Sequence, residues 1–313
     1  MKPFLARYGT ALMGVAICVL LAVFAQNFAT PANLVNVLKQ SSFLILLAIG
    51  FTFALITSEL DLSFASICSL AAVVTGALLY HHYPFVLAIP VGLGIGAAGG
   101  MLNGCLVTVV KVPSLIATLG MASIAGGTAF MLTGGVAFVG RWDPYFLFLA
   151  KGSVLGVPVL VIVTVVAFAL SVLVTERMRL GIHMRATGEA PESARRAGVA
   201  IRRMKFLGLT LSGLAAGLVA VLLVANLSSA SPDMAGDFLL EAIAATLLGM
   251  TMFTPGRANV AGSAAGALII TVLGNGLVLL GAAYYLQSIV LGLIIIGSVS
   301  VSASVMKKAA FSM

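Results

Sequence analysis

Long apolar stretches recur through the whole chain, and polar residues gather in the short segments between them. Most are close to the roughly 20 residues that a helix needs to cross a bilayer. Apolar and polar positions do not alternate within them, which favours helices over the strands of a barrel. Ten spans are predicted, at residues 8–26, 42–58, 63–80, 85–109, 114–133, 157–175, 206–225, 238–253, 260–281 and 286–303.

The first apolar stretch, 8–26, follows Lys2 and Arg7, a pattern that it shares with secretory signal peptides. A signal peptide usually has an apolar core of roughly 7–15 residues, which is shorter than this stretch. The prediction is therefore a retained helix, with a cleaved leader as the alternative.

The composition restricts the environment of the chain. Of its 313 residues, 61% are hydrophobic and only 8% are charged, whereas soluble domains carry roughly 25% charged residues. A water-soluble fold with so few charges could not cover its apolar core. We therefore predict an all-α integral membrane protein, with one transmembrane domain over 1–313 and a lipid bilayer around it. The net charge of +8 does not indicate nucleic-acid binding, because the positions of the basic residues along the chain are explained by the orientation of the protein in the membrane.

Basic residues are concentrated in segment 176–205, which holds eight of the seventeen Lys and Arg residues. Loops rich in Lys and Arg stay in the cytoplasm. Six spans before this segment and four after it place both termini there too, with Lys2, Arg7, Lys307 and Lys308. Lys111 and Arg257 then also face the cytoplasm, and the basic residues left on the outer side are Lys39, Arg141 and Lys151.

Glycines recur at intervals of four in the predicted span 85–109, at Gly92, Gly96, Gly100 and Gly104. This spacing places them on one helix face, where a neighbouring helix can approach backbone to backbone. The prediction is a packing surface without a role in transport. The same spacing occurs once each in the pairs Gly213/Gly217 and Gly262/Gly266.

Residues for bond chemistry are scarce in this chain. The three histidines lie in short polar segments, and no hydrolase or metal-site motif is present. No lysine follows a glycine, which excludes the phosphate-binding loop that many ATPases use. We therefore predict no catalytic residue, no metal and no cofactor on this chain; if ATP drives it, another polypeptide supplies the ATP site.

The segment 58–63, Ser-Glu-Leu-Asp-Leu-Ser, places two acidic residues between predicted spans. Carboxylates at membrane depth are costly, at about 2.5–3.5 kcal/mol near a helix centre. Glu59, Asp61 and Ser63 are therefore candidates for a gate or a turn that lines the pathway. The alternative is a tight solvated turn in which Asp61 or Ser63 caps the next helix, and the two roles are compatible.

The segment 186–198 within the basic region predicts a short helix outside the membrane. Pro191 suits the first turn of a helix, and Glu192 suits the positive end of its dipole. Arg195 lies near the other end, and Gly198 is available to end the helix. This segment is interpreted either as a docking helix for a cytoplasmic partner or as a charged loop that only sets orientation.

Four amides in or beside the predicted spans can hydrogen-bond a hydroxylated solute. The alternative is hydrogen bonding between helices, typically below about 1 kcal/mol each. These candidate pathway residues are Asn103, Asn226, Asn275 and Gln287.

Four stretches, in order and at similar spacing, resemble the permease subunit of ribose-type sugar ABC importers, a family that includes permeases for other monosaccharides and for autoinducer-2. The resemblance covers nearly the whole chain. The stretches are SELDLSFAS at 58–66, VPSLIATLG at 112–120, RATGEAPESARRAGV at 185–199 and LEAIAATLLGMT at 240–251.

The resemblance implies an ABC importer permease fold in the bacterial inner membrane. It implies two permease subunits, identical or paralogous, each docked on an ATPase subunit that binds ATP and Mg²⁺. It also implies a periplasmic or lipid-anchored sugar-binding protein, and import by alternating access. The residues expected to couple to the ATPase, in the coupling loop 176–205, are Gly188, Glu189, Glu192, Ala194, Arg195 and Gly198.

The chain departs from the family pattern at several places. The family usually carries glycine where Ser58 stands, Val-Gly where Phe64 and Ala65 stand, and a second glycine at Met250. The turn 254–259, with Pro255, also has fewer glycines than usual. These differences leave the sugar and the strength of coupling open. A self-sufficient secondary transporter is the alternative function, although such proteins usually carry ionisable residues within their spans.

Overall fold

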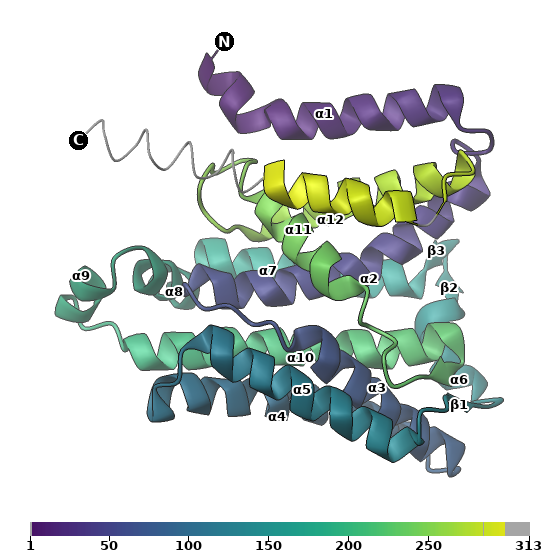
Figure 1. Ribbon diagram of the computed structural model, residues 1–313, viewed down its shortest axis with the longest axis horizontal. Helices are drawn as coiled ribbons and strands as arrows, with labels where there is room; N and C mark the ends of the chain where they lie inside the picture. Colours follow the sequence, from purple (N-terminus) through teal and green to yellow (C-terminus); the bar gives the residue numbers. More distant parts are fainter. Residues whose placement is uncertain (1, 284, 298–313) are drawn as a thin grey trace. The chain divides into compact units, whose positions relative to one another are not determined.

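The computed structural model describes residues 2–283 and 285–297, and it is almost entirely helical (Figure 1). The last part of the expected span 286–303 and the basic residues Lys307 and Lys308 lie outside the described residues. The helices are α1 (Lys2–Phe24), α2 (Pro31–Ile56), α3 (Phe64–Tyr80), α4 (Phe85–Cys105) with its π-helical extension η1 (Leu106–Val110), α5 (Ser114–Thr133), α6 (Pro144–Lys151), α7 (Val159–Arg177), α8 (Arg179–Glu189), α9 (Pro191–Arg196), α10 (Ile201–Leu227), α11 (Phe238–Gly249) and α12 (Val260–Leu279).

Apolar helices lie at all ten positions where spans are predicted. Six described helices are long and apolar enough to cross a membrane: Pro31–Ile56, Phe85–Val110, Ser114–Thr133, Val159–Arg177, Ile201–Leu227 and Val260–Leu279. The shorter apolar helices are Thr10–Phe24, Phe64–Tyr80, Phe238–Gly249 and Tyr285–Gly297. The chain is therefore a helical, multi-pass membrane protein, while the count of ten spans stays a prediction.

Several helices extend beyond the apolar stretches that predict them. Helix α2 begins at Pro31 instead of residue 42, and α10 begins at Ile201 instead of residue 206. The parts of these helices before the apolar stretches carry polar residues such as Lys39 and Arg202. An apolar stretch marks only the part of a helix that lipid or protein must surround, so it underestimates helices whose ends are polar.

The chain forms two compact units, a terminal unit of Met1–Ala48 and Leu240–Met313 and a central unit of Ile49–Leu239. In the central unit, α4 and α10 run side by side and antiparallel (Figure 1). The predicted glycine stripe lies on this contact. A Cβ atom on Gly96 would come within 2.5 Å of Gly217 Cα, and one on Gly100 within 2.5 Å of Leu209 O. Because glycine has no Cβ, the two backbones can touch, as predicted.

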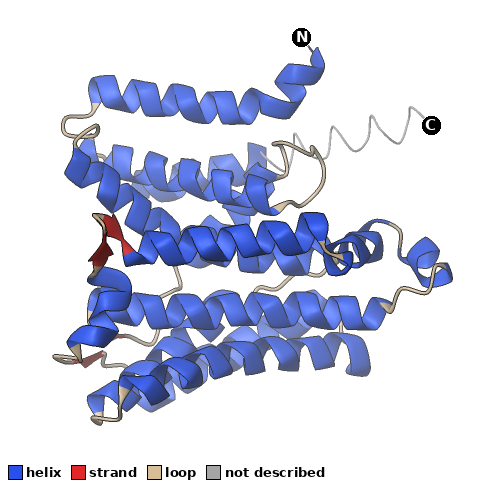
Figure 2. Ribbon diagram, turned by 180° about the vertical axis from the view of Figure 1, so that it is seen from behind, coloured by secondary structure: helices blue, strands red, loops and turns tan. Residues whose placement is uncertain are grey.

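The two ends of the central unit differ in structure. Figure 2 shows the strands at one end, opposite α8 and α9. There β1 (Phe138–Val139) pairs antiparallel with β4 (Ser229–Ala230), and β2 (Ser153–Val154) pairs with β3 (Val157–Pro158). We call the end that carries the strands the strand end, and the end that carries α8 and α9 the α9 end.

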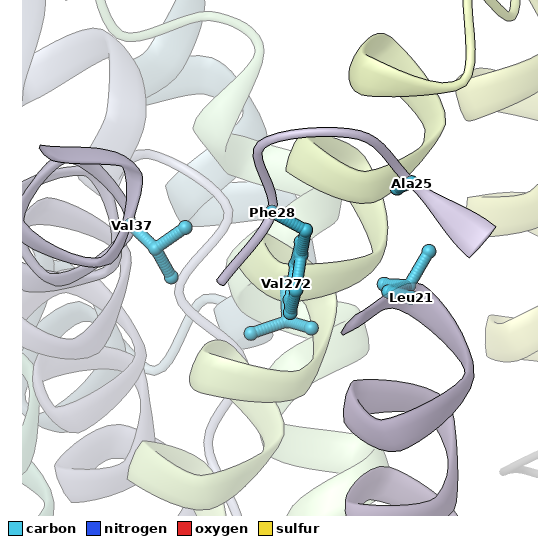
Figure 3. Packing of buried hydrophobic residues seen from close by; sticks show 5 residues of the cluster. All are labelled: Leu21, Ala25, Phe28, Val37 and Val272. Carbon is cyan, nitrogen blue, oxygen red and sulfur yellow. The ribbon is translucent and has the colours of Figure 1, made fainter. Parts of the chain in front are cut away.

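The terminal unit is built from α1, the first part of α2, α11, α12 and the helix Tyr285–Gly297. Figure 3 shows its apolar cluster, in which Phe28 lies against Val272 of α12. The pair Gly262/Gly266 also follows its prediction, because Cβ atoms there would collide with the backbone of α11 at Gly249 and Ala245. The remaining members of the cluster are Leu21, Ala25 and Val37.

Candidate coupling site

The turn between α2 and α3, residues 57–63, lies at the α9 end of the central unit and touches four other helices. Glu59 is 6% exposed, and Asp61 and Ser63 are fully buried. The alternative of a solvated turn is therefore wrong for these side chains. They are buried because helices from later parts of the chain close over the turn, which the local sequence cannot indicate.

The first contact joins the turn to α8. Ser58 Oγ donates a hydrogen bond to the carbonyl oxygen of Gly188, 3.0 Å away. A Cβ atom on Gly188 would collide with the carbonyl oxygen of Ile56, at the end of α2. Only glycine therefore allows α8 to approach the start of the turn this closely.

A second set of contacts joins the turn to α10 and α5. Lys205 Nζ donates to Glu59 Oε1 at 2.5 Å, which neutralises a carboxylate that is shielded from water. Leu60 is held by α5: its N–H donates to Ser114 Oγ at 3.3 Å, and its carbonyl oxygen accepts from Thr118 Oγ1 at 3.2 Å. The turn is thus fixed by side chains and by backbone.

The third contact joins the turn to α4. Asp61 Oδ1 accepts from the backbone N–H and the hydroxyl of Ser63, at 2.9 and 2.6 Å. Asn103 Nδ2 then donates to Ser63 Oγ at 2.7 Å. Burial raises the pKa of the Asp61 carboxyl, and the neighbouring hydroxyls of Ser63 and Ser212 partly oppose this rise. Ser63 occupies the N-cap of α3, but its side chain makes no capping bond. Asp61 holds the N-cap residue instead.

The second candidate segment, 186–198, has the expected short helix. Helix α9 has Pro191 in its first turn, and Arg195 forms an exposed ion pair of 3.4 Å with Glu192. Gly198 follows with a φ of +82°, a conformation that glycine adopts without strain. Ala194 is buried, while Glu189 at the end of α8 is exposed. The helix is confirmed, and its docking role stays a prediction.

The four candidate pathway amides do not converge. Asn103 is fully buried and bonded to the turn, whereas Asn226 lies half-buried near the strand end of α10. In the terminal unit, Asn275 exchanges two hydrogen bonds with Asn33 of α2, at 2.9 and 3.0 Å. Gln287 lines a small cavity of about 20 Å³ beside Glu241 and Gly274. Asn103 and Asn275 thus make the hydrogen bonds between segments that the alternative interpretation expects.

Sequence reasoning missed two features of this site. Lys205 was counted only as one of many basic residues, because its partner lies 146 positions away. Helix α8 was missed because it has no apolar stretch. Its buried residues Gly181, Met184 and Thr187 lie three apart, and this spacing is the signal that could have found it.

The fold and these contacts define the class of the protein. The sequence matches the family described as "Branched-chain amino acid transport system / permease component" over residues 33–299. This match covers well over half of the chain, so the protein belongs to that family of ABC transporter permeases. It is a membrane permease component and not an enzyme.

Individual relatives are more specific. The ribose import permease protein RbsC of Escherichia coli strain K12 is 34% identical over 294 residues, which cover 92% of this chain and 91% of the relative. The D-allose transport system permease protein AlsC of the same strain is 31% identical, covering 97% and 94%. These relatives confirm the resemblance to ribose-type permeases.

A solved structure also matches the fold. It is assigned to the metal-chelate type of ABC transporter, in an inward-facing conformation. The TM-score is 0.54 at 13% identity, and the match covers 99% of this chain and all of the other. At this identity the likeness concerns the fold alone.

Proposed function

We propose that this protein is the membrane permease of an ABC importer that carries a monosaccharide, or a similar small polar solute, across the bacterial inner membrane. The observation that carries the proposal is the contact between the two candidate segments, through Ser58 and Gly188. A docked ATPase would press on α8 and α9. The turn 57–63, whose side chains Glu59, Asp61 and Ser63 are buried, would receive that displacement and pass it to α3, α4 and α5.

The proposed mechanism is alternating access. ATP binding to a separate ATPase subunit, which holds ATP and Mg²⁺, favours one of two packings of the helices. The permease itself performs no bond chemistry. Two permease subunits, identical or paralogous, would enclose the pathway, and a periplasmic or lipid-anchored binding protein would deliver the sugar. Ribose and D-allose import by relatives supports a monosaccharide as the solute.

The proposed orientation places the α9 end and both termini in the cytoplasm, with ten spans in total. The contacts support it. Segments assigned to the cytoplasm, including 57–63 and 178–205, meet at one end of the central unit. Segments assigned to the outside meet at the other end, where Lys151 Nζ donates to Ser228 Oγ at 2.7 Å.

The decisive experiment isolates the protein from its native membrane in mild detergent and identifies the chains that copurify. We expect an ATPase subunit, and we expect its loss in the double charge reversal Glu192→Arg with Arg195→Glu. Both side chains are exposed, so the variant should still insert and fold. Arg141→Glu is the control: it reverses an exposed charge at the strand end, outside the coupling loop, and should retain the ATPase.

Transport assays separate the two functional classes. Liposomes with the permease, the ATPase and the binding protein should accumulate sugar only when ATP is present. Uptake by the permease alone, without ATP, would instead establish a self-sufficient secondary transporter and contradict the importer.

A further inference from the structure

A basic cavity of about 350 Å³ opens at the α9 end of the central unit, between η1 and the first turns of α10. Its volume is within the range of small-molecule sites. Two arginines supply its charge and four other residues its walls. The residues that line it are Thr108, Val109, Arg202, Arg203, Phe206 and Leu207.

The charge in this cavity is uncompensated. Arg202 and Arg203 are both exposed, and among the described residues neither lies within ion-pair distance of a carboxylate. The first turn of α10 contains no acidic residue and no side chain caps its N-terminus, so the positive end of the helix dipole adds to the same field. The positive field in the cavity therefore favours binding of an anion. Guanidinium groups suit phosphate in particular, because they can donate two parallel hydrogen bonds to it.

The walls of the cavity are apolar and continue onto an exposed apolar surface. Val109 is 72% exposed and Val110 is 63% exposed. Phe206 forms a firm floor, because its ring packs against Gly104, where a Cβ atom would come within 2.7 Å. A free phosphate or an acidic peptide would leave these apolar walls in water, whereas a phospholipid covers them with its acyl chains.

We propose that this cavity binds the headgroup of an anionic phospholipid, with the phosphate on Arg202 and Arg203 and the acyl chains along Val109. The assignment to the cytoplasmic leaflet rests on the orientation proposed above, but the site does not. Anionic lipids and basic residues attract each other at membrane surfaces, with roughly a fivefold gain in affinity for each basic residue. A lipid seated here would contact α10 two positions before Lys205, the partner of Glu59.

The test is native mass spectrometry of the purified permease with added phosphatidylglycerol or phosphatidylcholine. We expect one tightly bound phosphatidylglycerol per chain and weaker binding of phosphatidylcholine. The variant Arg202→Gln with Arg203→Gln should bind phosphatidylglycerol about 30-fold more weakly, because two such contacts are lost. The matched control, Arg177→Gln with Arg179→Gln, removes the same charge from nearby exposed positions and should bind as the unchanged protein does.

Single and conservative variants of the two arginines, and competition by inorganic phosphate, test the same lipid binding independently. If the double variant does not fold, each single variant should weaken binding about fivefold, and Arg202→Lys with Arg203→Lys should retain most of it. Equal binding of the two lipids, equal loss in the control, or displacement by millimolar inorganic phosphate would overturn the proposal. The isolated permease suffices for this assay, so its result is independent of whether an ATPase docks on α9.

Discussion

At the scale of single residues, Ser58 explains one departure from the family pattern. Its backbone φ is +60°, a left-handed conformation that costs side-chain-bearing residues energy and that glycine adopts freely. The ribose-type family usually carries glycine at this position. Here a serine takes the same conformation, and its hydroxyl gains a bond to Gly188. The departure therefore preserves the shape of the turn.

Substitutions at Ser58 should separate backbone strain from the hydrogen bond. Ser58→Gly should change stability by less than about 1 kcal/mol, because relief of strain offsets the lost bond. Ser58→Val should destabilise by about 1–3 kcal/mol, because a β-branched residue is poorly suited to this conformation. Thermal aggregation in detergent measures both. Ser123→Val is the control on α5, where an exposed serine bonds the preceding turn of its own helix.

The Glu59–Lys205 pair makes a second prediction. Glu59→Lys places two cations together at a buried position, so we expect a loss of about 1–3 kcal/mol, limited by the partial exposure of Lys205. The swap of Glu59→Lys with Lys205→Glu should restore much of the loss. The same thermal assay tests this, and a swap no better than the single change would contradict a direct ion pair.

At the scale of helices, the α4–α10 contact shows what the sequence could predict. Gly92 to Gly104 recur every four residues, so the packing face was evident without knowing its partner. The identity of the partner helix follows only from tertiary structure, as does the burial of Glu59, Asp61 and Ser63. Periodic apolar and glycine patterns are local, and the sequence predicts them. Contacts such as that of Lys205 with Glu59 join residues far apart in the chain, and the local sequence does not predict them.

Two glycines on α4 test this contact directly. Gly96→Leu should prevent folding, because even a Cβ atom would collide with α10. Gly94→Leu adds the same side chain on the same helix where no atom lies within 4 Å, so it should fold normally. The yield of monodisperse protein after size-exclusion chromatography measures the difference. Equal yields would mean that the two helices separate more readily than this packing implies.

For the molecule as a whole, the distribution of Lys and Arg along the sequence predicts its orientation in the membrane, and cysteine labelling can test that orientation. Leu155 is fully exposed at the β2–β3 turn of the strand end, and Glu192 is exposed on α9. In a cysteine-free background, Leu155→Cys should react with a membrane-impermeant maleimide in intact spheroplasts. Glu192→Cys should react only after lysis. The reverse pattern would invert the proposed topology.

The direct backbone contact between α4 and α10 also limits how the protein can move. Side chains between two helices can change rotamer and let the helices slide, but here Gly96 and Gly213 leave no side chain to rearrange. The two helices are therefore expected to move together as one rigid body. If ATP-driven movement reaches Lys205 at the start of α10, we expect α4 to move with it, and we expect bending in segments outside this pair, such as the π-helical turn η1 at the end of α4.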